Sequence, residues 1–399
     1  MPKIMQFNVT ANWGSTGRIA EQINIKALEQ GWDCYIVYGR NNTPSRSKLI
    51  RVGTSFDIYE HYIENRLFDN EGLASRRATK KLIEKIILIN PDIIHLHNIH
   101  DHWLNYKLLF EYLNQTNIPI VWTFHDCWAF TGHCAHFVNN KCFKWIDKCS
   151  KCRQTRSLID YSLRNFLLKK TLFTSNKNLH IVAVSDWLGK LCQMSLFKNM
   201  DIRVIENGID LSLFKPSYTP FYYKISDDKF VIMAVSSQWK GGNKGLDDYF
   251  KMSKILKDDE IIVLVGVHED LRNNLPSNII GICRTNNQQE LASLYTRANV
   301  ITSLSSAETF GLTIIEGNAC GTPAVVYDNT APPSLITSET GFVVPNEDYK
   351  AAYDAIQVIK SKGKKSYFKA CIELAKKYDH NECSMKYVEL YRSLIKKSN

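Results

Sequence analysis

The 399-residue chain contains the stretch Ser305-Ser-Ala-Glu308-Thr-Phe-Gly311-Leu-Thr-Ile-Ile-Glu316-Gly-Asn-Ala-Cys-Gly321-Thr-Pro323 directly after a buried, apolar run. The run predicts a strand that ends at Ser305, and a helix is expected to start near Gly311. Two glutamates lie eight residues apart, Glu308 in the connecting loop and Glu316 on the helix. A loop carboxylate at a helix start can accept hydrogen bonds from sugar hydroxyls, and one inside the helix can hold a diol such as ribose. The alternative is that neither glutamate binds a ligand: one caps the helix, and the other is a solvated surface residue.

Apolar runs alternate with helical stretches over the whole chain, in two series. The first series comprises Ile4–Val9, Cys34–Tyr38, Ile93–His97, Ile118–Phe124, His180–Val184 and Ile202–Ile205. The second comprises Phe230–Val235, Ile261–Val265, Ile279–Cys283, Val300–Leu304, Ala324–Tyr327 and Phe342–Val344. Continuous hydrophobicity indicates strands buried on both faces, as in parallel sheets covered by helices. The sequence therefore predicts an α/β fold of two doubly wound, Rossmann-like domains facing an interdomain cleft, with residues 1–212 in the first domain and 213–380 in the second.

A glycine-containing turn follows the first strand of each domain. Gly14 and Gly17 precede a helical stretch, where backbone amides can approach an anion, although a tight turn without a ligand explains them equally well. In the second domain, Lys240-Gly-Gly-Asn-Lys244-Gly245 occupies the equivalent place. Exposed amides together with two ammonium groups suit a diphosphate better than a single negative charge, and a plain loop is the alternative.

These residues resemble a known family. The two glutamates, with Phe310-Gly311 after the first and Gly321-Thr-Pro323 after the second, look like the donor-site signature of the retaining glycosyltransferases of family 4, which have the GT-B fold. Matching landmarks are Asn207 to Phe214, Lys244-Gly245, Thr285 to Tyr295 and Thr123-Phe-His125-Asp126-Cys-Trp128. The stretch from Thr123 to Cys152 further resembles members that build bacterial surface polysaccharides. The likeness covers nearly the whole chain.

The resemblance implies that the second domain binds a nucleotide-sugar donor and the first domain the acceptor, with residues 381–399 as a helix that crosses back onto the first domain. Lys244 would neutralise the diphosphate, Glu308 would hold donor hydroxyls, and Glu316 the ribose. His125 matches the histidine beside the donor sugar, so His125, Glu308 and Lys244 are the candidate catalytic residues. The candidate donor-binding residues are Gly14, Gly17, Lys240, Lys244, Arg284, Thr285, Glu308, Phe310, Gly311, Leu312 and Glu316.

One position departs from the family pattern. Many members carry an arginine five residues before the lysine of Lys-Gly, whereas this chain has Trp239 there. Lys240 or Arg284 is expected to supply the second cation. Because no Asp-x-Asp motif lies near the donor loops, catalysis is expected to need no metal or other cofactor: fixed cations can stabilise the leaving diphosphate.

Five of the eleven cysteines crowd into the segment 127–177. Cys134, Cys142, Cys149 and Cys152 follow a C-x7-C-x6-C-x2-C pattern, which offers four thiolates to a structural zinc ion. Unligated cysteines in an irregular insertion are the alternative. Structural disulfides are not expected, because the chain shows no secretory signal and cytoplasmic thiols stay reduced.

The net charge of +10 is concentrated in the same segment, since residues 141–177 hold ten Lys and Arg against two Asp. Cations mixed with large apolar groups suit an anionic membrane surface, and a solvated helix face is the alternative. No apolar run approaches the roughly 20 residues that cross a bilayer. We therefore expect a cytoplasmic protein, with contact through 141–177 to the inner face of the cytoplasmic membrane. Nucleic-acid binding is not expected, because no recognised motif supports it.

The sequence as a whole predicts a retaining, metal-independent glycosyltransferase that moves a sugar from a nucleotide-sugar donor to a glycan or polyprenyl-linked acceptor in bacterial polysaccharide biosynthesis. A UDP-sugar is expected ahead of a GDP-sugar. Two alternatives remain: a nucleotide-sugar epimerase, which needs no acceptor, and a noncatalytic nucleotide-sugar or polysaccharide-binding protein, which never releases nucleotide diphosphate.

Overall fold

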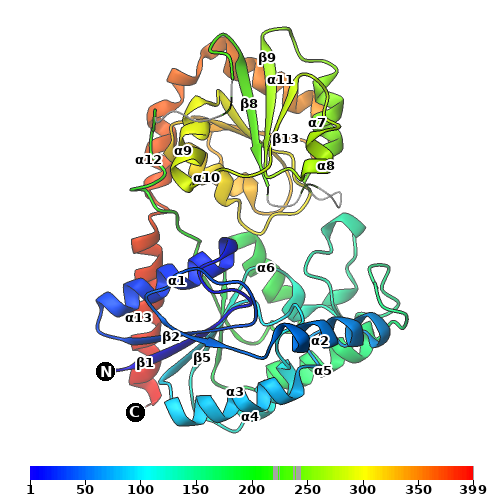
Figure 1. Ribbon diagram of the computed structural model, residues 1–399, viewed down its shortest axis with the longest axis vertical. Helices are drawn as coiled ribbons and strands as arrows, with labels where there is room; N and C mark the ends of the chain where they lie inside the picture. Colours follow the sequence, from blue (N-terminus) through cyan, green and yellow to red (C-terminus); the bar gives the residue numbers. More distant parts are fainter. Residues whose placement is uncertain (219–222, 224, 237–238, 240–243, 399) are drawn as a thin grey trace. The chain divides into compact units, whose positions relative to one another are not determined.

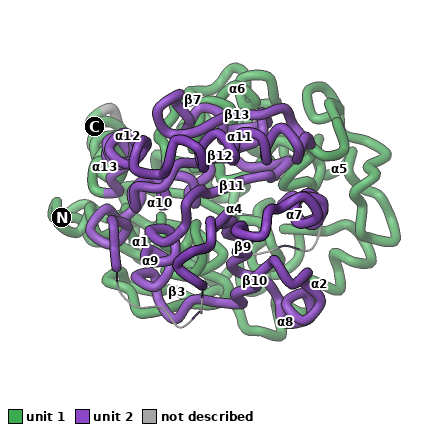
Figure 2. Tube along the Cα trace, turned by 90° about the horizontal axis from the view of Figure 1, so that it is seen from above, with its two compact units in different colours: residues 1–206, 381–399 green, residues 207–380 purple. Residues whose placement is uncertain are grey.

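A computed structural model describes residues 1–218, 223, 225–236, 239 and 244–398. The chain divides into two compact units, coloured separately in Figure 2. Unit 1 comprises residues 1–206 and 381–399, and unit 2 comprises residues 207–380. The structural division therefore lies next to Asn207, a few residues before the boundary expected from the sequence.

Unit 1 is built on a seven-stranded parallel sheet in the order β3-β2-β1-β4-β5-β6-β7. Its strands are β1 (Lys3–Phe7), β2 (Asp33–Tyr38), β3 (Lys48–Arg51), β4 (Ile93–Leu96), β5 (Ile120–Phe124), β6 (Leu179–Ala183) and β7 (Asp201–Val204). Its helices are α1 (Gly14–Glu29), α2 (Ser55–Phe68), α3 (Arg76–Ile89), α4 (Tyr106–Leu113), α5 (Ser162–Thr174), α6 (Asp186–Met194) and α13 (His380–Ser398). The central strands β4 and β5 are buried at every residue, as their continuous hydrophobicity requires.

Helices cover both faces of this sheet, as Figure 1 shows, with α3, α4 and α5 lying together. The C-terminal helix α13 belongs to unit 1, where Tyr391 hydrogen-bonds to His95 of β4 and packs edge-on against Trp32. Tyr387, one turn earlier, accepts a hydrogen bond from Thr123 of β5. A segment nearly 300 residues away in sequence thus packs against the centre of the sheet.

Unit 2 repeats the architecture with a six-stranded parallel sheet in the order β10-β9-β8-β11-β12-β13. Its strands are β8 (Phe230–Val235), β9 (Glu260–Val265), β10 (Ile279–Ile282), β11 (Val300–Ser303), β12 (Ala324–Tyr327) and β13 (Gly341–Val344). Its helices are α7 (Leu246–Ser253), α8 (Glu269–Arg272), α9 (Gln288–Arg297), α10 (Leu312–Ala319), α11 (Tyr349–Lys362) and α12 (Phe368–Lys376). Aliphatic strand residues and the inner faces of α7 and α11 form its core.

Strand order reverses once in each sheet, between β1 and β4 in unit 1 and between β8 and β11 in unit 2. Loops that leave the carboxyl ends of two such strands run in opposite directions and open a crevice, which is where doubly wound sheets bind ligands. The reversal therefore locates the candidate sites within each unit.

Candidate functional site

In unit 2, Lys244 and Glu308 come from the two loops that flank the strand-order reversal. Lys244 follows β8 and Glu308 follows β11, and the Lys244 ammonium forms an ion pair with the Glu308 carboxylate. Both side chains are partly exposed. The backbone of Glu308 is held by the turn after β12, because its N–H donates to Thr330 Oγ1 at 3.0 Å and its carbonyl accepts from the Ala331 N–H. The sequence named both residues as separate candidates but predicted neither their ion pair nor the Thr330 contact.

Glycines shape the two loops. Gly245 has φ +69° and precedes α7, and a Cβ there would lie 2.1 Å from the Leu304 carbonyl oxygen. The loops after β8 and β11 can approach this closely only because residue 245 has no side chain. Gly311 has φ +116° and precedes α10, so the first amides of that helix follow directly after the Glu308 loop. Amides at a helix N-terminus carry partial positive charge and favour anions.

Glu316 lies one turn into α10, where Tyr295 of α9 donates a hydrogen bond to it at 2.8 Å. Burial, with the Glu316 charge, raises the pKa of Tyr295 well above its usual range, so the phenol remains a donor. Phe310 is buried and packs edge-on against Tyr378, whereas Leu312 is only partly buried. Glu308 lies in the loop before α10 and pairs with Lys244, whereas Glu316 lies within α10 and accepts from Tyr295.

The remaining donor residues expected in unit 2 lie elsewhere in the unit or outside the described part of the chain. Arg284 and Thr285 follow β10, at the edge of the sheet, with the Arg284 side chain exposed and its carbonyl accepting from the Tyr223 hydroxyl. Trp239 is buried, and its indole N–H donates to the Val265 carbonyl at 2.9 Å. Lys240 lies outside the described residues.

In unit 1, Gly14 and Gly17 stand in the first turn of α1, after β1. Gly14 has φ +67°, and a Cβ on Gly17 would lie 2.7 Å from Thr10 Oγ1. The Thr10 hydroxyl donates to the Trp13 carbonyl at 2.7 Å, which fixes the turn. Gly17 is therefore required for packing of the helix against the preceding loop, whatever binds at the turn.

His125 follows β5 and lies beside His97, which follows β4. His97 Nδ1 and His125 Nε2 are 2.9 Å apart, and His97 Nε2 lies 2.5 Å from the side-chain oxygen of Gln6. The Gln6 amide nitrogen donates to Ala20 and Asn24 of α1, so the Gln6 oxygen must accept the His97 Nε2–H. His97 then accepts at Nδ1, and His125 donates from Nε2.

Burial lowers the pKa of His125 to about 4, although the Asp126 charge opposes the shift, and it lowers the pKa of His97 as well. His125 is therefore neutral at pH 7 and acts as a hydrogen-bonding group, with its proton position set by Gln6. The sequence identified His125, but the role of Gln6 depends on the pairing of β1 with β4, which sequence spacing does not show.

The neighbouring Asp126 forms an ion pair with His100. Its carboxylate lies 2.8 Å from His100 Nε2 and also accepts the Trp128 N–H. Although burial disfavours the imidazolium, the Asp126 charge raises the pKa of His100 to about 9. Burial likewise disfavours the carboxylate, but the His100 charge lowers the pKa of Asp126 to about 2. The His100–Asp126 ion pair, whose two side chains are largely buried, therefore fixes the loop after β5.

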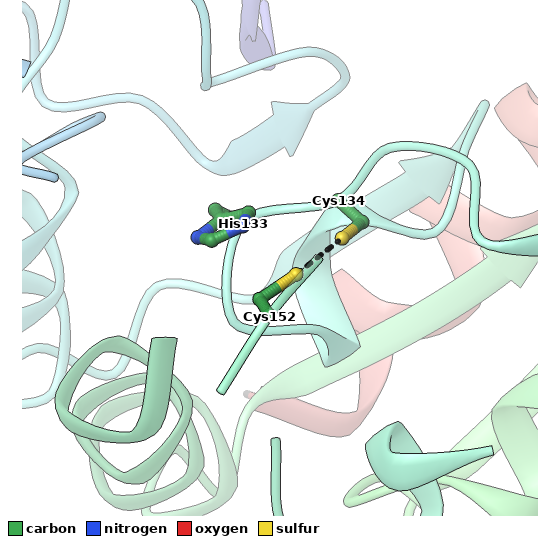
Figure 3. Close-up of side chains that lie close together, drawn as sticks. All are labelled: His133, Cys134 and Cys152. Carbon is green, nitrogen blue, oxygen red and sulfur yellow. Dashed lines mark hydrogen bonds between the residues drawn. The ribbon is translucent and has the colours of Figure 1, made fainter. Parts of the chain in front are cut away.

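The cysteines of the segment 127–177 lie together in unit 1. Cys134 and Cys152 have their sulfur atoms 3.6 Å apart, and a ring nitrogen of His133 lies within 4.8 Å of both (Figure 3). Cys142 and Cys149 line the same cavity, which has a volume of about 500 Å³. All eleven cysteines fall within the described residues, and none of them forms a disulfide.

Two family models match consecutive parts of the chain: one described as "Glycosyltransferase Family 4" matches residues 20–213, and one described as "Glycosyl transferases group 1" matches residues 222–378. Together they span most of both units. The chain belongs to glycosyltransferase family 4. The protein is therefore a glycosyltransferase.

Curated relatives agree with this assignment. A putative colanic acid biosynthesis glycosyl transferase of Escherichia coli is 21% identical over 86% of this chain and 88% of its own length. An N,N'-diacetylbacillosaminyl-diphospho-undecaprenol alpha-1,3-N-acetylgalactosaminyltransferase of Campylobacter jejuni is 24% identical over 63% of this chain and 68% of its own length.

Solved structures show the GT-B fold for this glycosyltransferase. Sucrose-phosphate synthase from Thermosynechococcus elongatus superposes with a TM-score of 0.75 at 18% identity over 100% of both chains. The Anabaena protein HepE, solved in complex with UDP, superposes with a TM-score of 0.65 at 15% identity over 98% of this chain and 100% of its own. Among the described residues of this chain, no helix combines the length and apolar character that spanning a bilayer requires.

Proposed function

We propose that this glycosyltransferase transfers a sugar from a nucleotide-sugar donor, a UDP-sugar ahead of a GDP-sugar, to a glycan or polyprenyl-linked acceptor in bacterial polysaccharide biosynthesis. The names of the Escherichia coli and Campylobacter relatives support the acceptor class, and the UDP complex of HepE supports the donor class. Transfer retains the anomeric configuration. The sugar–phosphate bond breaks, the acceptor oxygen attacks on the same face, and the acceptor proton passes to the departing phosphate.

The observation that carries the proposal is the Lys244–Glu308 ion pair beside the start of α10. Each charge compensates the other in the protein alone, and a nucleotide-sugar offers each a new partner. Lys244 and the α10 amides would take the diphosphate, where negative charge grows in the transition state, and Glu308 would take the sugar hydroxyls. Glu316, oriented by Tyr295, would hold the ribose.

The other donor residues follow from the same assignment. Arg284 and Thr285 would contact the base, and Phe310, Gly311 and Leu312 would shape the helix start beneath the phosphates. Lys240 and Arg284 stay candidates for the second cation, since the buried Trp239 cannot supply it. We also propose that Gly14 and Gly17 admit an anion to the turn before α1, and that neutral His125 hydrogen-bonds to the donor sugar.

We further propose that catalysis uses no divalent metal, because Lys244 and the helix amides supply the positive charge. Initial rates measured with a chelator and without added cations should equal those measured with Mg²⁺. A rate that depends on added Mg²⁺ or Mn²⁺ would assign the phosphate charge to a metal instead.

The test uses release of UDP or GDP from purified protein with a panel of nucleotide-sugars and an extract of polyprenyl-linked glycans. Lys244→Ala and Glu308→Gln should each reduce turnover by at least about 100-fold, the scale of a lost transition-state contact. Lys376→Ala is the matched control, because Lys376 forms an ion pair with Glu373 that is exposed to solvent in the same unit. Turnover near wild type in either site variant would refute the assignment.

The same assay separates the alternatives. An epimerase would convert the donor sugar without acceptor, and a binding protein would bind the donor without releasing nucleotide diphosphate under any condition. Product NMR decides the stereochemistry, since retention and inversion give different anomeric couplings.

We propose that the segment 141–177 contacts the inner face of the cytoplasmic membrane. Phe143, Leu158 and Leu167 expose 69%, 82% and 46% of their surfaces among nine exposed cations. The tenth cation of the segment, Lys169, is buried and donates to the Trp128 carbonyl. Leu158 donates its backbone N–H to Arg66 at the end of α2, a helix that exposes further apolar side chains. Vesicles containing anionic lipid should bind the protein in low salt and release it in high salt, and Leu158→Glu should weaken binding. Binding to neutral vesicles only would contradict the proposal.

A further inference from the structure

The loop between β5 and α5 is long, and it has little core of its own. Its regular structure within residues 127–161 consists of three short 3₁₀ turns, Trp128–Phe130, Val138–Asn140 and Lys144–Ile146. Three aromatic rings, Phe130, Phe137 and Trp145, pack against one another at its centre. So small a core rarely fixes a loop of this length, and a disulfide or metal is the usual supplement.

The spacing of two cysteines in this loop fits a shared metal ion. Cys134 Sγ and Cys152 Sγ are 3.6 Å apart and point toward each other in Figure 3. Two thiolates on one tetrahedral zinc, each about 2.3 Å from the metal, lie about 3.8 Å apart. A disulfide would require a separation of about 2.05 Å. The observed separation is that of a hydrogen bond between two thiols, it is too long for a covalent bond, and it also fits two ligands of one ion.

Two further cysteines belong to the same cavity, although the ligand atoms that lie within 4.8 Å of one another are those of His133, Cys134 and Cys152. Cys142 and Cys149 line the same cavity as Cys134 and Cys152. Cys149 and Cys152 form a C-x2-C pair, the spacing at which structural zinc sites take two ligands from one turn. Backbone N–H groups already face two of the sulfurs: Gln154 donates to Cys152 Sγ at 3.4 Å, and Gly132 donates to the Cys149 sulfur. Such donors stabilise thiolate charge.

Asp69 orients the His133 ring beside the cysteines. His133 Nδ1 lies 3.2 Å from the Asp69 carboxylate, and the ring also contacts Cys152. Around zinc, a carboxylate often hydrogen-bonds to a histidine and fixes its orientation without contacting the metal itself. A His133 ring nitrogen also lies within 4.8 Å of both Cys134 Sγ and Cys152 Sγ, so His133 is the alternative to one of the thiolates as a ligand, and cobalt substitution distinguishes the two.

We propose that Cys134, Cys142, Cys149 and Cys152 bind one structural Zn²⁺ as four thiolates, and that His133, oriented by Asp69, hydrogen-bonds to Cys152. Each thiol releases its proton to solvent when it binds the metal. The ion closes the loop directly after His125 and Asp126: Cys127 donates its N–H to the Ala135 carbonyl, and the Thr131 hydroxyl donates to the Cys134 carbonyl. The site is independent of the proposed sugar transfer.

Metal content of the full-length protein, purified without chelator from zinc-supplemented medium, tests the site. Wild type should contain about one zinc per chain, and Cys134→Ser and Cys149→Ser should contain almost none. Cys283→Ser, a similarly half-buried cysteine in unit 2, is the matched control and should retain the metal. Wild type that lacks zinc, or a Cys134–Cys152 disulfide detected by mass spectrometry, overturns the proposal.

A second measurement decides the result if the cysteine variants do not fold. A thiol-blocking reagent added to folded wild type should release one zinc as four thiols react. Zinc release with no dependence on thiol modification would contradict a thiolate site.

Cobalt substitution identifies the ligands. Co²⁺ bound by four thiolates absorbs at longer wavelength than Co²⁺ bound by three thiolates and an imidazole. His133→Asn should keep the wild-type cobalt spectrum while weakening metal retention about 10–100-fold, as loss of an outer contact does. A spectrum altered by His133→Asn would make His133 a ligand and overturn the four-cysteine assignment.

Discussion

Gly245 shows how a single missing side chain allows the candidate donor loops to approach each other. The residue combines φ +69° with a position where a Cβ would lie 2.1 Å from the Leu304 carbonyl oxygen. We predict that Gly245→Ala lowers the free energy of unfolding by at least about 2 kcal/mol and weakens UDP binding. Gly363→Ala is the control, because Gly363 also has a positive φ, +76°, but a Cβ added there would meet no atom within 4 Å. Denaturant unfolding that shows equal losses for both variants would exclude the steric contribution.

His100 and Asp126 give the loops after β4 and β5 a defined pH dependence. The pKa of His100 is raised from 6.5 to about 9 on folding, so its contribution to stability is complete below pH 6.5 and is lost as the pH rises through 9. The pKa of Asp126 is lowered from 3.8 to about 2, so its contribution is present above pH 3.8 and is lost as the pH falls through 2. The pair therefore contributes fully between about pH 4 and 6.5.

We predict that His100→Gln costs about 3 kcal/mol at pH 6 and distinctly less at pH 9.5, measured by urea unfolding at each pH. The matched control is His180→Gln, because His180 faces Asp201 in a pair that is much more exposed, where the cost should stay below about 1 kcal/mol. A cost for His100→Gln that does not change with pH would show that packing, and not charge, explains it.

The candidate site could be predicted where its residues share one loop and helix. Glu308, Gly311 and Glu316 could be assigned to a strand, a turn and a helix from local pattern alone, and the structure places them so. The contacts that orient them come from remote segments: Thr330 after β12 and Tyr295 on α9. Such partners depend on strand order, which no local spacing encodes.

At the scale of elements, C-terminal helix α13 is joined to the sheet of unit 1 by buried hydroxyl groups. Tyr391 Oη lies 2.6 Å from His95 Nδ1, whereas Thr123 and the Tyr387 hydroxyl lie 3.2 Å apart. We predict that Tyr391→Phe costs about 1–3 kcal/mol, because it leaves a buried imidazole nitrogen unsatisfied, and that Tyr387→Phe costs less. Thermal unfolding of the two variants compares them directly. A larger loss in Tyr387→Phe would contradict this ranking.

Strand prediction succeeded where hydrophobicity is continuous. Phe230–Val235 and Ala324–Tyr327 coincide with β8 and β12, and the other predicted strands agree to within two residues at each end. The strand that the sequence analysis did not find is β3, Lys48–Arg51, at the edge of the sheet. Its ends are exposed and charged, so it lacks the apolar run that marks a strand buried on both faces.

At the scale of the whole molecule, the two units differ in how the chain builds them. Unit 2 is continuous, whereas unit 1 needs residues 381–399 as well as 1–206. The last residues contribute Tyr387 and Tyr391 to the centre of the unit 1 sheet. The family resemblance implied that residues 381–399 pack on the first domain, but the strands that they contact, β4 and β5, are identified only by the structure.

We predict that truncation after His380 destabilises unit 1 while unit 2 keeps its structure and its nucleotide binding. Removal of α13 exposes the His95 face of β4 and β5, whereas the Lys244–Glu308 loops and α10 keep every partner described above. Hydrogen exchange measured by mass spectrometry should show lost protection in β4 and β5 and unchanged protection in β8 and β11. UDP titrated into the truncated protein should bind with an affinity within a few-fold of wild type. Lost protection in β8 and β11 would mean that the donor unit depends on α13, and would contradict its independence as a folding unit.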